Sequence, residues 1–419
     1  MMRNMEGTSI VSPDSYVMNT TQYATISLSI SRQNPIKNDK GFEQTQLFFY
    51  ILGQLRKQQL AQKYGGLFGQ AFMYSTGVYF GGRNHVWGLR IPDARYLDLG
   101  EELIGRLLAE LLSLDADCSP SEEVRLWEQA RGNLIQRVER IFNDPFLYAA
   151  SRYLEYVTGA TESGTGVQGS YEIYSALSYV EWSEHKRTAM HNMQQFRTNI
   201  TLLGDLSQAD AETVSQLSQD DHRTEQMSGY INKQFQTPSV PAAQEWKEST
   251  KLIQNQTIII GGFRCNNKHG FKDHIYAKML DGWMGKYGDP YLLQTLRSAP
   301  VSAYHAGSRY DMMTGIWLIS ACVRSGMERN AAKIIKHCLE QQVLTSSRLE
   351  TIKKGLIEEL MFILDKPEGR MAYGPIMRTY NIQVSDIFHL VNEVTSAQLQ
   401  RFVDKQVQFG GVYWLKGGR

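Results

Sequence analysis

The sequence contains one ordered set of local patterns twice. Residues 40–43 (KGFE) and residues 269–272 (HGFK) each follow a strand-like run and open a helix-like run, at an offset of 229 residues. Residues 119–122 (SPSE) and 347–350 (SRLE) both carry the capping-box pattern that starts a helix. A repeat of this length is a duplicated domain, since solenoid units span roughly 20–50 residues. We therefore expect two homologous domains.

Strand and helix patterns alternate within each copy. Residues 23–30 alternate between apolar and small polar side chains, which predicts a half-buried strand, and leucines recur every four residues through residues 99–111, which predicts an amphipathic helix. Residues 143–145 (NDP) and 365–367 (DKP) break the last long helices at matching places. The fold class predicted is α+β, with two homologous α/β-sandwich domains, each of one sheet with helices mainly on one face.

The boundary between the copies follows from composition. The segment from residue 207 to about 250 is rich in Gln, Ser, Asp, Thr and Pro, as an exposed linker would be. We therefore expect an N-terminal domain at residues 1–206, a linker at 207–250 and a C-terminal domain at 251–419.

Bulk composition excludes several classes of protein. The chain is 42% apolar with a net charge of +1, and it has no continuous apolar run of membrane-spanning length. This argues against a membrane protein and against a nucleic-acid-binding protein. The four cysteines are Cys118, Cys265, Cys322 and Cys338, which form no C-x-x-C pair and suit a reducing cytoplasm. We expect a cytoplasmic protein.

Motifs for independent catalysis are missing. His269 and His274 are five residues apart, whereas a zinc-binding helix places its histidines at i and i+4, so solvated loop histidines are favoured over a metal site. Residues 164–169 match G-x-G-x-x-G but follow a helix, which favours a flexible loop over a dinucleotide site. The sequence has no H-x-x-E-H, no phosphate-binding G-x-x-x-x-G-K-[ST] and no G-x-S-x-G.

Two polar residues stand out between a helix and a strand of the second copy. Residues 296–304 read LRSAPVSAY, with Arg297 and Tyr304 seven residues apart. Residue chemistry alone allows a rim arginine and a core aromatic.

The repeat resembles the M16 family of metallopeptidases, which includes insulinase and the processing peptidases. Residues 287–297 (YGDPYLLQTLR) and 302–306 (SAYHA) are similar to the signature of that family's C-terminal domain. Residues 136–148 are similar to non-catalytic subunits of the small bacterial two-chain (M16B-like) branch, which includes proteins associated with elongation factor P modification and with subtilosin-type peptide maturation.

This resemblance implies that a second chain carries the catalytic zinc site. Catalytic members carry the inverted zinc motif H-x-x-E-H on the first helix, where residues 47–51 read LFFYI, so we expect no metal and no cofactor in this chain. The resemblance implies a heterodimer whose catalytic partner bears H-x-x-E-H and binds zinc. In that arrangement Arg297 and Tyr304 would act in trans, the arginine on a peptide carbonyl or carboxylate and the phenol on the oxyanion.

Two functions remain open at this stage. In the first, the chain is the non-catalytic subunit of a zinc peptidase, encloses a peptide substrate and assists maturation of ribosomally made peptides such as bacteriocins. In the second, it is a peptide-binding or scaffold protein without proteolysis, including as a homodimer. The pairing of Arg297 with Tyr304 favours the first function, although a degenerate subunit could retain both for packing.

Overall fold

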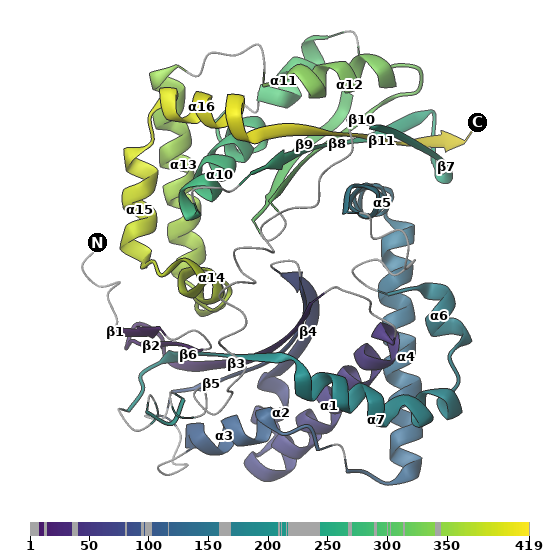
Figure 1. Ribbon diagram of the computed structural model, residues 1–419, viewed down its shortest axis with the longest axis vertical. Coiled ribbons are helices and arrows are strands. Elements are labelled where there is room, and N and C mark those ends of the chain that lie inside the picture. The colour runs from purple at the N-terminus through teal and green to yellow at the C-terminus, as the bar shows by residue number, and fades with distance from the viewer. Residues whose placement is uncertain are drawn as a thin grey trace. The chain divides into compact units, whose positions relative to one another are not determined.

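The computed structural model describes residues 8–11, 15–35, 41–79, 82–93, 96, 103–115, 117–158, 169–207, 210, 212–214, 216, 244–266, 270–288, 291–299, 301, 303–312, 315–339 and 345–418 (Figure 1). The chain divides into two compact units. Unit 1 consists of Met1–Arg137, Val167–Lys233 and Ile363–Ile382, and unit 2 of Val138–Gly166, Gln234–Phe362 and Gln383–Arg419.

Unit 1 is built on a six-stranded sheet with the order β1-β2-β6-β3-β5-β4. Strands β2 and β6 run parallel, and the other neighbouring pairs run antiparallel. Its strands are β1 (Thr8–Val11), β2 (Ser15–Asn19), β3 (Thr25–Pro35), β4 (Phe72–Tyr79), β5 (Gly82–Pro92) and β6 (Arg197–Gly204).

Unit 2 is built on a five-stranded sheet with the order β7-β11-β8-β10-β9, in which only the β7 and β11 pair is parallel. Its strands are β7 (Gln244–Gln254), β8 (Gln256–Cys265), β9 (Ala303–Asp311), β10 (Ile316–Arg324) and β11 (Val407–Gly418). Apart from β1, the two sheets have the same order and the same parallel pair. This confirms the predicted α+β fold with two homologous units.

The helices also occur in the same order in the two halves of the chain. In the first half they are α1 (Phe42–Tyr64), α2 (Gly66–Ala71), α3 (Leu103–Leu112), α4 (Pro120–Asn143), α5 (Pro145–Thr158), α6 (Tyr171–Ala176) and α7 (Tyr179–Gln195). In the second half they are α10 (Phe271–Gly285), α11 (Tyr291–Ser298), α12 (Glu328–His337), α13 (Ser346–Leu364), α14 (Pro367–Tyr380), α15 (Val384–Glu393) and α16 (Ser396–Gln406).

One helix of each half packs on the sheet built mainly from the other half. Helix α14 lies against β2, β3 and β6 in unit 1, on the sheet face opposite α1 and α2, and α5 lies against β7, β8 and β11 in unit 2 (Figure 1). The strand predicted at residues 23–30 is therefore covered on both faces in its middle. Leu28 is 2% exposed, and Ser27, expected on the open face, is 4% exposed.

Two adjacent glycines of β8 let helices approach both faces of the unit 2 sheet. A Cβ added at Gly262 would lie 2.0 Å from the phenol oxygen of Tyr153 on α5, and one at Gly261 would lie 2.5 Å from Ile335 on α12. Because neighbouring strand residues point to opposite faces, each glycine serves one helix. Alanine at either position would push a helix away.

Helix starts follow the predicted caps in the first half but not in the second. Ser119 Oγ accepts from the Glu122 amide at 3.3 Å, and Asp144 Oδ1 accepts from the Phe146 and Leu147 amides, which explains the break before Pro145. The capping box predicted at residues 347–350 is wrong, because α13 begins at Ser346 and Thr345 Oγ1 accepts from the Arg348 amide.

Candidate functional site

The stretch of α1 at residues 47–51 is part of the core of unit 1. Leu47, Phe48 and Phe49 are fully buried, and Ile51 is 2% exposed. A helix of this kind presents apolar groups to the sheet instead of charged or ligating ones. The local sequence therefore builds a packing surface at the place where a catalytic relative would carry its zinc motif.

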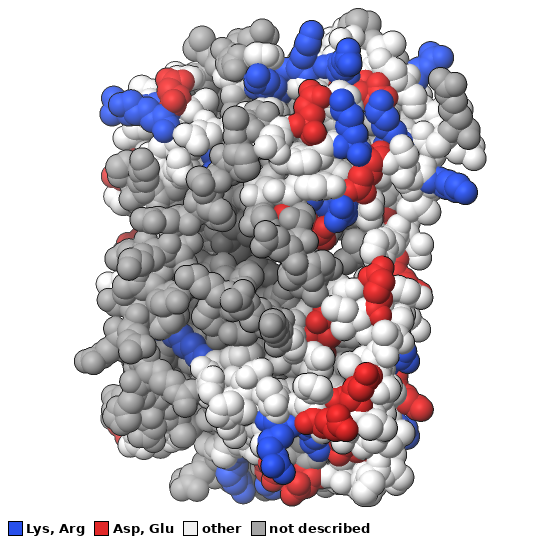
Figure 2. All heavy atoms as spheres, turned by 45° about the vertical axis from the view of Figure 1, so that its right-hand side comes forward, with Lys and Arg blue, Asp and Glu red and all other residues white. Residues whose placement is uncertain are grey.

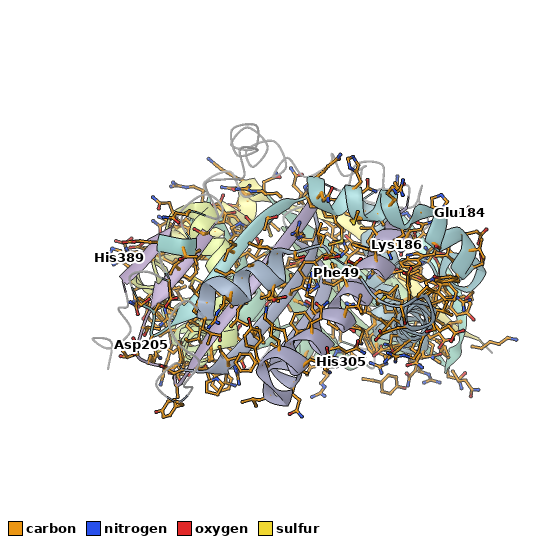
Figure 3. The ribbon with its side chains drawn as sticks, turned by 90° about the horizontal axis from the view of Figure 1, so that it is seen from below. Phe49, Glu184, Lys186, Asp205, His305 and His389 are labelled. Carbon is orange, nitrogen blue, oxygen red and sulfur yellow. The ribbon has the colours of Figure 1, made fainter. Side chains whose placement is uncertain are left out.

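The ring of Phe49 lies in an aromatic cluster with β5. It stacks on Trp87, with ring centroids 5.0 Å apart and an angle of 16° between the ring planes. Its centroid also lies 4.8 Å from that of the His85 ring. Figure 3 labels Phe49. His85 is 2% exposed and stacks on Phe196 from its other side. The imidazole of His85 is thus in contact with two phenyl rings.

The polar side chains of α1 near this stretch bind protein groups. Arg137 of α4 donates to the Tyr50 hydroxyl at 2.6 Å. Tyr174 of α6 donates to Gln46 Oε1, and the Ser170 amide donates to Glu43 Oε1 at 3.1 Å. Glu43 and Gln46, which the sequence analysis did not single out, therefore join α1 to the start of α6.

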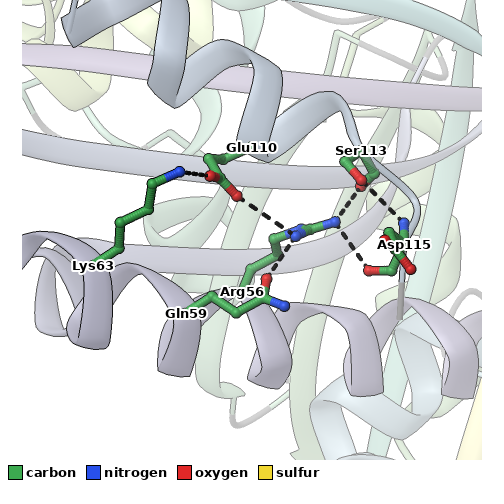
Figure 4. Close-up of polar contacts among 6 residues, drawn as sticks. All are labelled: Arg56, Gln59, Lys63, Glu110, Ser113 and Asp115. Carbon is green, nitrogen blue, oxygen red and sulfur yellow. Dashed lines mark hydrogen bonds and ion pairs between the residues drawn. The ribbon is translucent and has the colours of Figure 1, made fainter. Parts of the chain in front are cut away.

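An arginine anchors the C-terminal half of α1. Arg56, 3% exposed, donates to the carbonyl oxygens of Ser113 and Asp115 at 2.9 and 3.0 Å and lies 3.8 Å from Glu110, which also pairs with Lys63 (Figure 4). Burial lowers the pKa of Arg56, while the nearby Glu110 opposes that shift. These bonds fix α1 against the end of α3.

Zinc does not fit the residues at the motif position. A zinc site needs three or four nitrogen, sulfur or carboxylate donors, and Leu47, Tyr50 and Ile51 supply none of that kind. Among the residues that the structure describes, no group of three or more His, Cys, Asp or Glu is close enough to hold a metal ion.

Arg297 and Tyr304 lie at the junction of α11 and β9 in unit 2. Arg297 is in the last turn of α11 and exposed, beside the fully buried Leu296. Stacking of Trp283 on Tyr291, with ring centroids 5.4 Å apart, holds α11 against α10. Tyr304, expected just before a strand, is instead the second residue of β9.

A β-bulge exposes Tyr304. In the pairing of β9 with β10, His305 faces Cys322 and Ala303 faces Val323, so Tyr304 has no partner residue. Bulges of this kind redirect a side chain, and Tyr304 is 57% exposed. Within the described residues, neither Arg297 nor Tyr304 makes a hydrogen bond or ion pair.

Strand β9 is an edge strand with packing contacts on both of its faces. A Cβ at Gly285 of α10 would lie 2.7 Å from Ser308, whose hydroxyl donates to Asp281 Oδ1 at 2.6 Å and accepts from Trp317 Nε1 at 2.7 Å. On the other face, His305 meets the ring edge of Phe146 at 5.0 Å (Figure 3 labels His305). These contacts fix the strand that carries Tyr304.

The histidine cluster is not a pair of solvated loop residues. His269 lies outside the described residues, but His274 is in α10, fully buried, with its Nδ1 2.6 Å from the Tyr310 hydroxyl. The expectation of a solvated loop is therefore wrong for His274. Burial lowers the pKa of His274 to about 4, so its ring is neutral at physiological pH.

Two smaller expectations concern loops and cysteines. Residues 159–168, with most of the G-x-G-x-x-G match, lie outside the described residues. All four cysteines are free thiols.

No helix in the described part of the chain combines the length and apolarity that crossing a bilayer requires.

Comparison with known proteins adds relatives and structural neighbours. No family model matches the chain. The sequence is 25% identical over 402 residues to the antilisterial bacteriocin subtilosin biosynthesis protein AlbE of Bacillus subtilis (strain 168), covering 96% of this chain and 99% of that protein. It is 21% identical over 427 residues to the "Probable inactive metalloprotease YmfF" of the same organism, covering 96% and 95%.

Solved structures share the fold across the whole chain. A conserved protein from Enterococcus faecalis V583 superposes with a TM-score of 0.74 at 16% identity, covering 98% of this chain and 99% of that one. A peptidase M16 inactive domain from Pseudomonas fluorescens gives a TM-score of 0.72 at 15% identity, with 99% of both chains covered. The chain thus has the fold of M16 peptidase-like structures and is similar in sequence to AlbE and YmfF along nearly its whole length.

Proposed function

We propose that this chain is the non-catalytic subunit of a two-chain M16-type zinc peptidase that acts in peptide maturation. It would enclose a peptide together with a partner that bears H-x-x-E-H and binds the zinc, and it would supply Arg297 and Tyr304 to the reaction. Four free cysteines suit a cytoplasmic location for this complex.

The exposed Tyr304 at the bulge carries the proposal. An exposed phenol is accessible to a ligand, and its hydroxyl can donate one hydrogen bond. Tyr304 is 57% exposed on a strand whose other contacts are well fixed, which suits a phenol that must donate one hydrogen bond to a developing oxyanion.

Arg297 fits the companion role. Its guanidinium is exposed at the end of a short helix whose other side is buried, and it has no anionic partner among the described residues. A planar guanidinium can bind a peptide carbonyl or a terminal carboxylate through two hydrogen bonds. It would orient the peptide while Tyr304 acts at the bond being cleaved.

The composition of α1 supports a non-catalytic role for this chain within the pair. Phe49 and its neighbours at residues 47–51 are core residues, so the chain would depend on the partner for a nucleophilic water. The relative AlbE is named for subtilosin biosynthesis, which supports peptide maturation as the process.

One observation favours a second function. The relative YmfF is named "Probable inactive metalloprotease", and the similar Pseudomonas domain is called inactive. A peptide-binding or scaffold protein without proteolysis, including as a homodimer, would need neither Arg297 nor Tyr304 for chemistry.

Peptide cleavage separates the two functions. The chain, a candidate H-x-x-E-H partner and their mixture are incubated with a labelled precursor peptide, and the mixture is repeated with Arg297→Ala and Tyr304→Phe. Loss of one oxyanion donor typically lowers kcat by about 10²–10³-fold, so Tyr304→Phe is expected to lower kcat far more than KM. Arg309→Ala and Tyr96→Phe, which alter exposed residues of the same types, serve as matched controls.

The outcomes are distinct. Activity that needs both chains, is removed by a zinc chelator and drops in both variants but not in the controls supports the accessory subunit. Activity from the partner alone that is indifferent to this chain and to both variants supports the scaffold.

A further inference from the structure

The outward face of α12 in unit 2 is strongly basic. Arg329, Lys333 and Lys336 follow one another at i, i+4 and i+7, and all three are exposed. Arg324, also exposed, lies four residues before the helix. The opposite face packs on the sheet through Ala331, Ala332 and Ile335. We call Arg324, Arg329, Lys333 and Lys336 the basic stripe.

No acidic group among the described residues neutralises the basic stripe. None of its four members makes an ion pair with another described residue. The acid of the helix itself, Glu328, is 7% exposed and bound instead by the Thr257 hydroxyl at 3.0 Å and by Lys416 at 3.8 Å. Lys and Arg side chains gather at the upper end of Figure 2, the end where Figure 1 places α11 and α12.

The positive charges of Arg329 and Lys333 destabilise α12 as a helix. Like charges at i and i+4, here Arg329 and Lys333, and at i and i+3, here Lys333 and Lys336, repel each other on a helix surface. Arg329 is also in the first turn, where the helix dipole favours a negative side chain. Lys336 lies in the last turn, where the dipole favours a cation, so helix stability accounts for Lys336 but not for Arg329 and Lys333.

The duplication provides an internal comparison. Helix α3 occupies the position of α12 in the first half, and its outer side carries Arg106 and Glu110, opposite charges at i and i+4. Glu110 also pairs with Arg56 and Lys63 (Figure 4). The corresponding helix of the first half thus carries both charges, and the basic stripe is particular to the second half of this chain.

We propose that the basic stripe docks an acidic segment of a partner protein. Carboxylates at i, i+4 and i+7 of an acidic helix would match its spacing. The four cations of the stripe reach only the lower end of the roughly 4–8 that an anionic membrane surface calls for. Firm attachment to a membrane also needs an apolar anchor, and the other exposed residue of α12 is the polar Asn330. Nucleic acids call for a strongly basic domain with stacking aromatics, whereas this chain has a net charge of +1. This proposal does not depend on the function of Arg297 and Tyr304.

Binding of a labelled oligoglutamate peptide, long enough to cover the 10-residue helix, tests the docking surface. Fluorescence anisotropy is measured at low and near-physiological ionic strength for the whole chain and for a variant with Arg329→Glu, Lys333→Glu and Lys336→Glu. A matched control carries Arg187→Glu, Lys354→Glu and Arg401→Glu, exposed residues on α7, α13 and α16, with the same change in net charge. Anionic phosphatidylserine vesicles and single-stranded RNA are tested as separate ligands.

Salt-sensitive binding of oligoglutamate is expected, with affinity falling at least ~10-fold in the stripe variant and less than ~2-fold in the control. Far-ultraviolet circular dichroism of both variants establishes that each is folded. The proposal is overturned by equal losses in the two variants, by absence of oligoglutamate binding at low salt, or by tighter binding of vesicles or RNA than of oligoglutamate.

Discussion

The buried residues Leu47 and Ile51 prevent α1 from holding a zinc ion at the position of the motif. The substitutions Leu47→His, Tyr50→Glu and Ile51→His would write H-x-x-E-H into α1, but Leu47 is fully buried and Ile51 is 2% exposed. Each buried imidazole is expected to lower the free energy of unfolding by about 2–5 kcal/mol through lost packing and desolvation. We expect a large fall in Tm and no stoichiometric zinc binding in calorimetry. Leu47→Met, a change that conserves volume, is the control, and tight zinc binding with an unchanged Tm would contradict the prediction.

His274 gives unit 2 a pH dependence whose sign can be worked out. Its folded pKa of about 4 lies below the unfolded value of about 6.5, so only the unfolded chain binds this proton as the pH falls between those values. Its contribution to stability is complete above pH ~6.5 and is lost toward pH ~4, by up to ~3 kcal/mol. Urea unfolding across this range should show the slope, His274→Gln should flatten it, and the control His389→Gln, at an exposed residue, should leave it unchanged.

At the scale of single residues, the sequence identifies candidate side chains by their chemistry but does not predict whether each one is buried or exposed. The spacing of Arg297 and Tyr304 is visible in the sequence, but the bulge that exposes Tyr304 depends on the register with β10, which no local pattern encodes. The sequence favours a solvated His274 because its five-residue spacing from His269 does not suit a zinc-binding helix. Its burial comes from α10 packing on β9, a contact between residues about 36 positions apart.

Among the elements, α5 is joined to β7 by a carboxylate with several donors. Tyr148, Arg152 and Tyr156 of α5 all donate to Glu248, at 2.7 to 2.9 Å. Burial alone would raise the pKa of Glu248, but these hydrogen bonds outweigh it and hold the pKa below its usual value. The same contact and burial raise the pKa of Tyr148 to about 12.

Glu248→Gln is expected to weaken this junction. It removes the charge that Arg152 and two phenols share, so the free energy of unfolding should fall by about 1–3 kcal/mol. Urea unfolding at neutral pH measures the change. Glu245→Gln, on the exposed side of the same strand, should cost less than ~0.5 kcal/mol, and equal effects of the two substitutions would show that the junction is unimportant.

The elements were predictable where one face is polar and one apolar. The helices α3 and α4 and the strand β3 follow from their periodicity, whereas β8, which is buried almost throughout, follows from its place in the repeat. Strand β7 does not, since Gln244–Gln254 is largely polar and begins inside the stretch that composition assigned to a linker at residues 207–250. It is an edge strand, and polar edge strands resist aggregation, so composition alone suggests a loop. Residues 217–243 of that stretch lie outside the described residues.

At the scale of the whole molecule, the duplication comes with an exchange of helices. The sequence repeat places α5 in the first half and α14 in the second, yet α5 packs in unit 2 and α14 in unit 1. Sequence periodicity could not reveal this, because an amphipathic helix shows that one face is buried but not which sheet buries it. Each unit therefore depends on both halves of the chain.

Separating the halves should expose this dependence. A chain cut within residues 217–243 leaves the first half without α14, whose Tyr373, Ile376 and Met377 are each less than 10% exposed. Burial of three such side chains contributes about 5–9 kcal/mol, which is comparable to the whole stability of a domain. Expressed alone, each half should bind the dye ANS and unfold without a cooperative transition. Refolded together, the halves should form a one-to-one complex with the circular dichroism and Tm of the uncut chain. A first half that folds cooperatively by itself, with a Tm near that of the intact protein, would mean that α14 is dispensable to unit 1 and that the exchanged helices add little to either sheet.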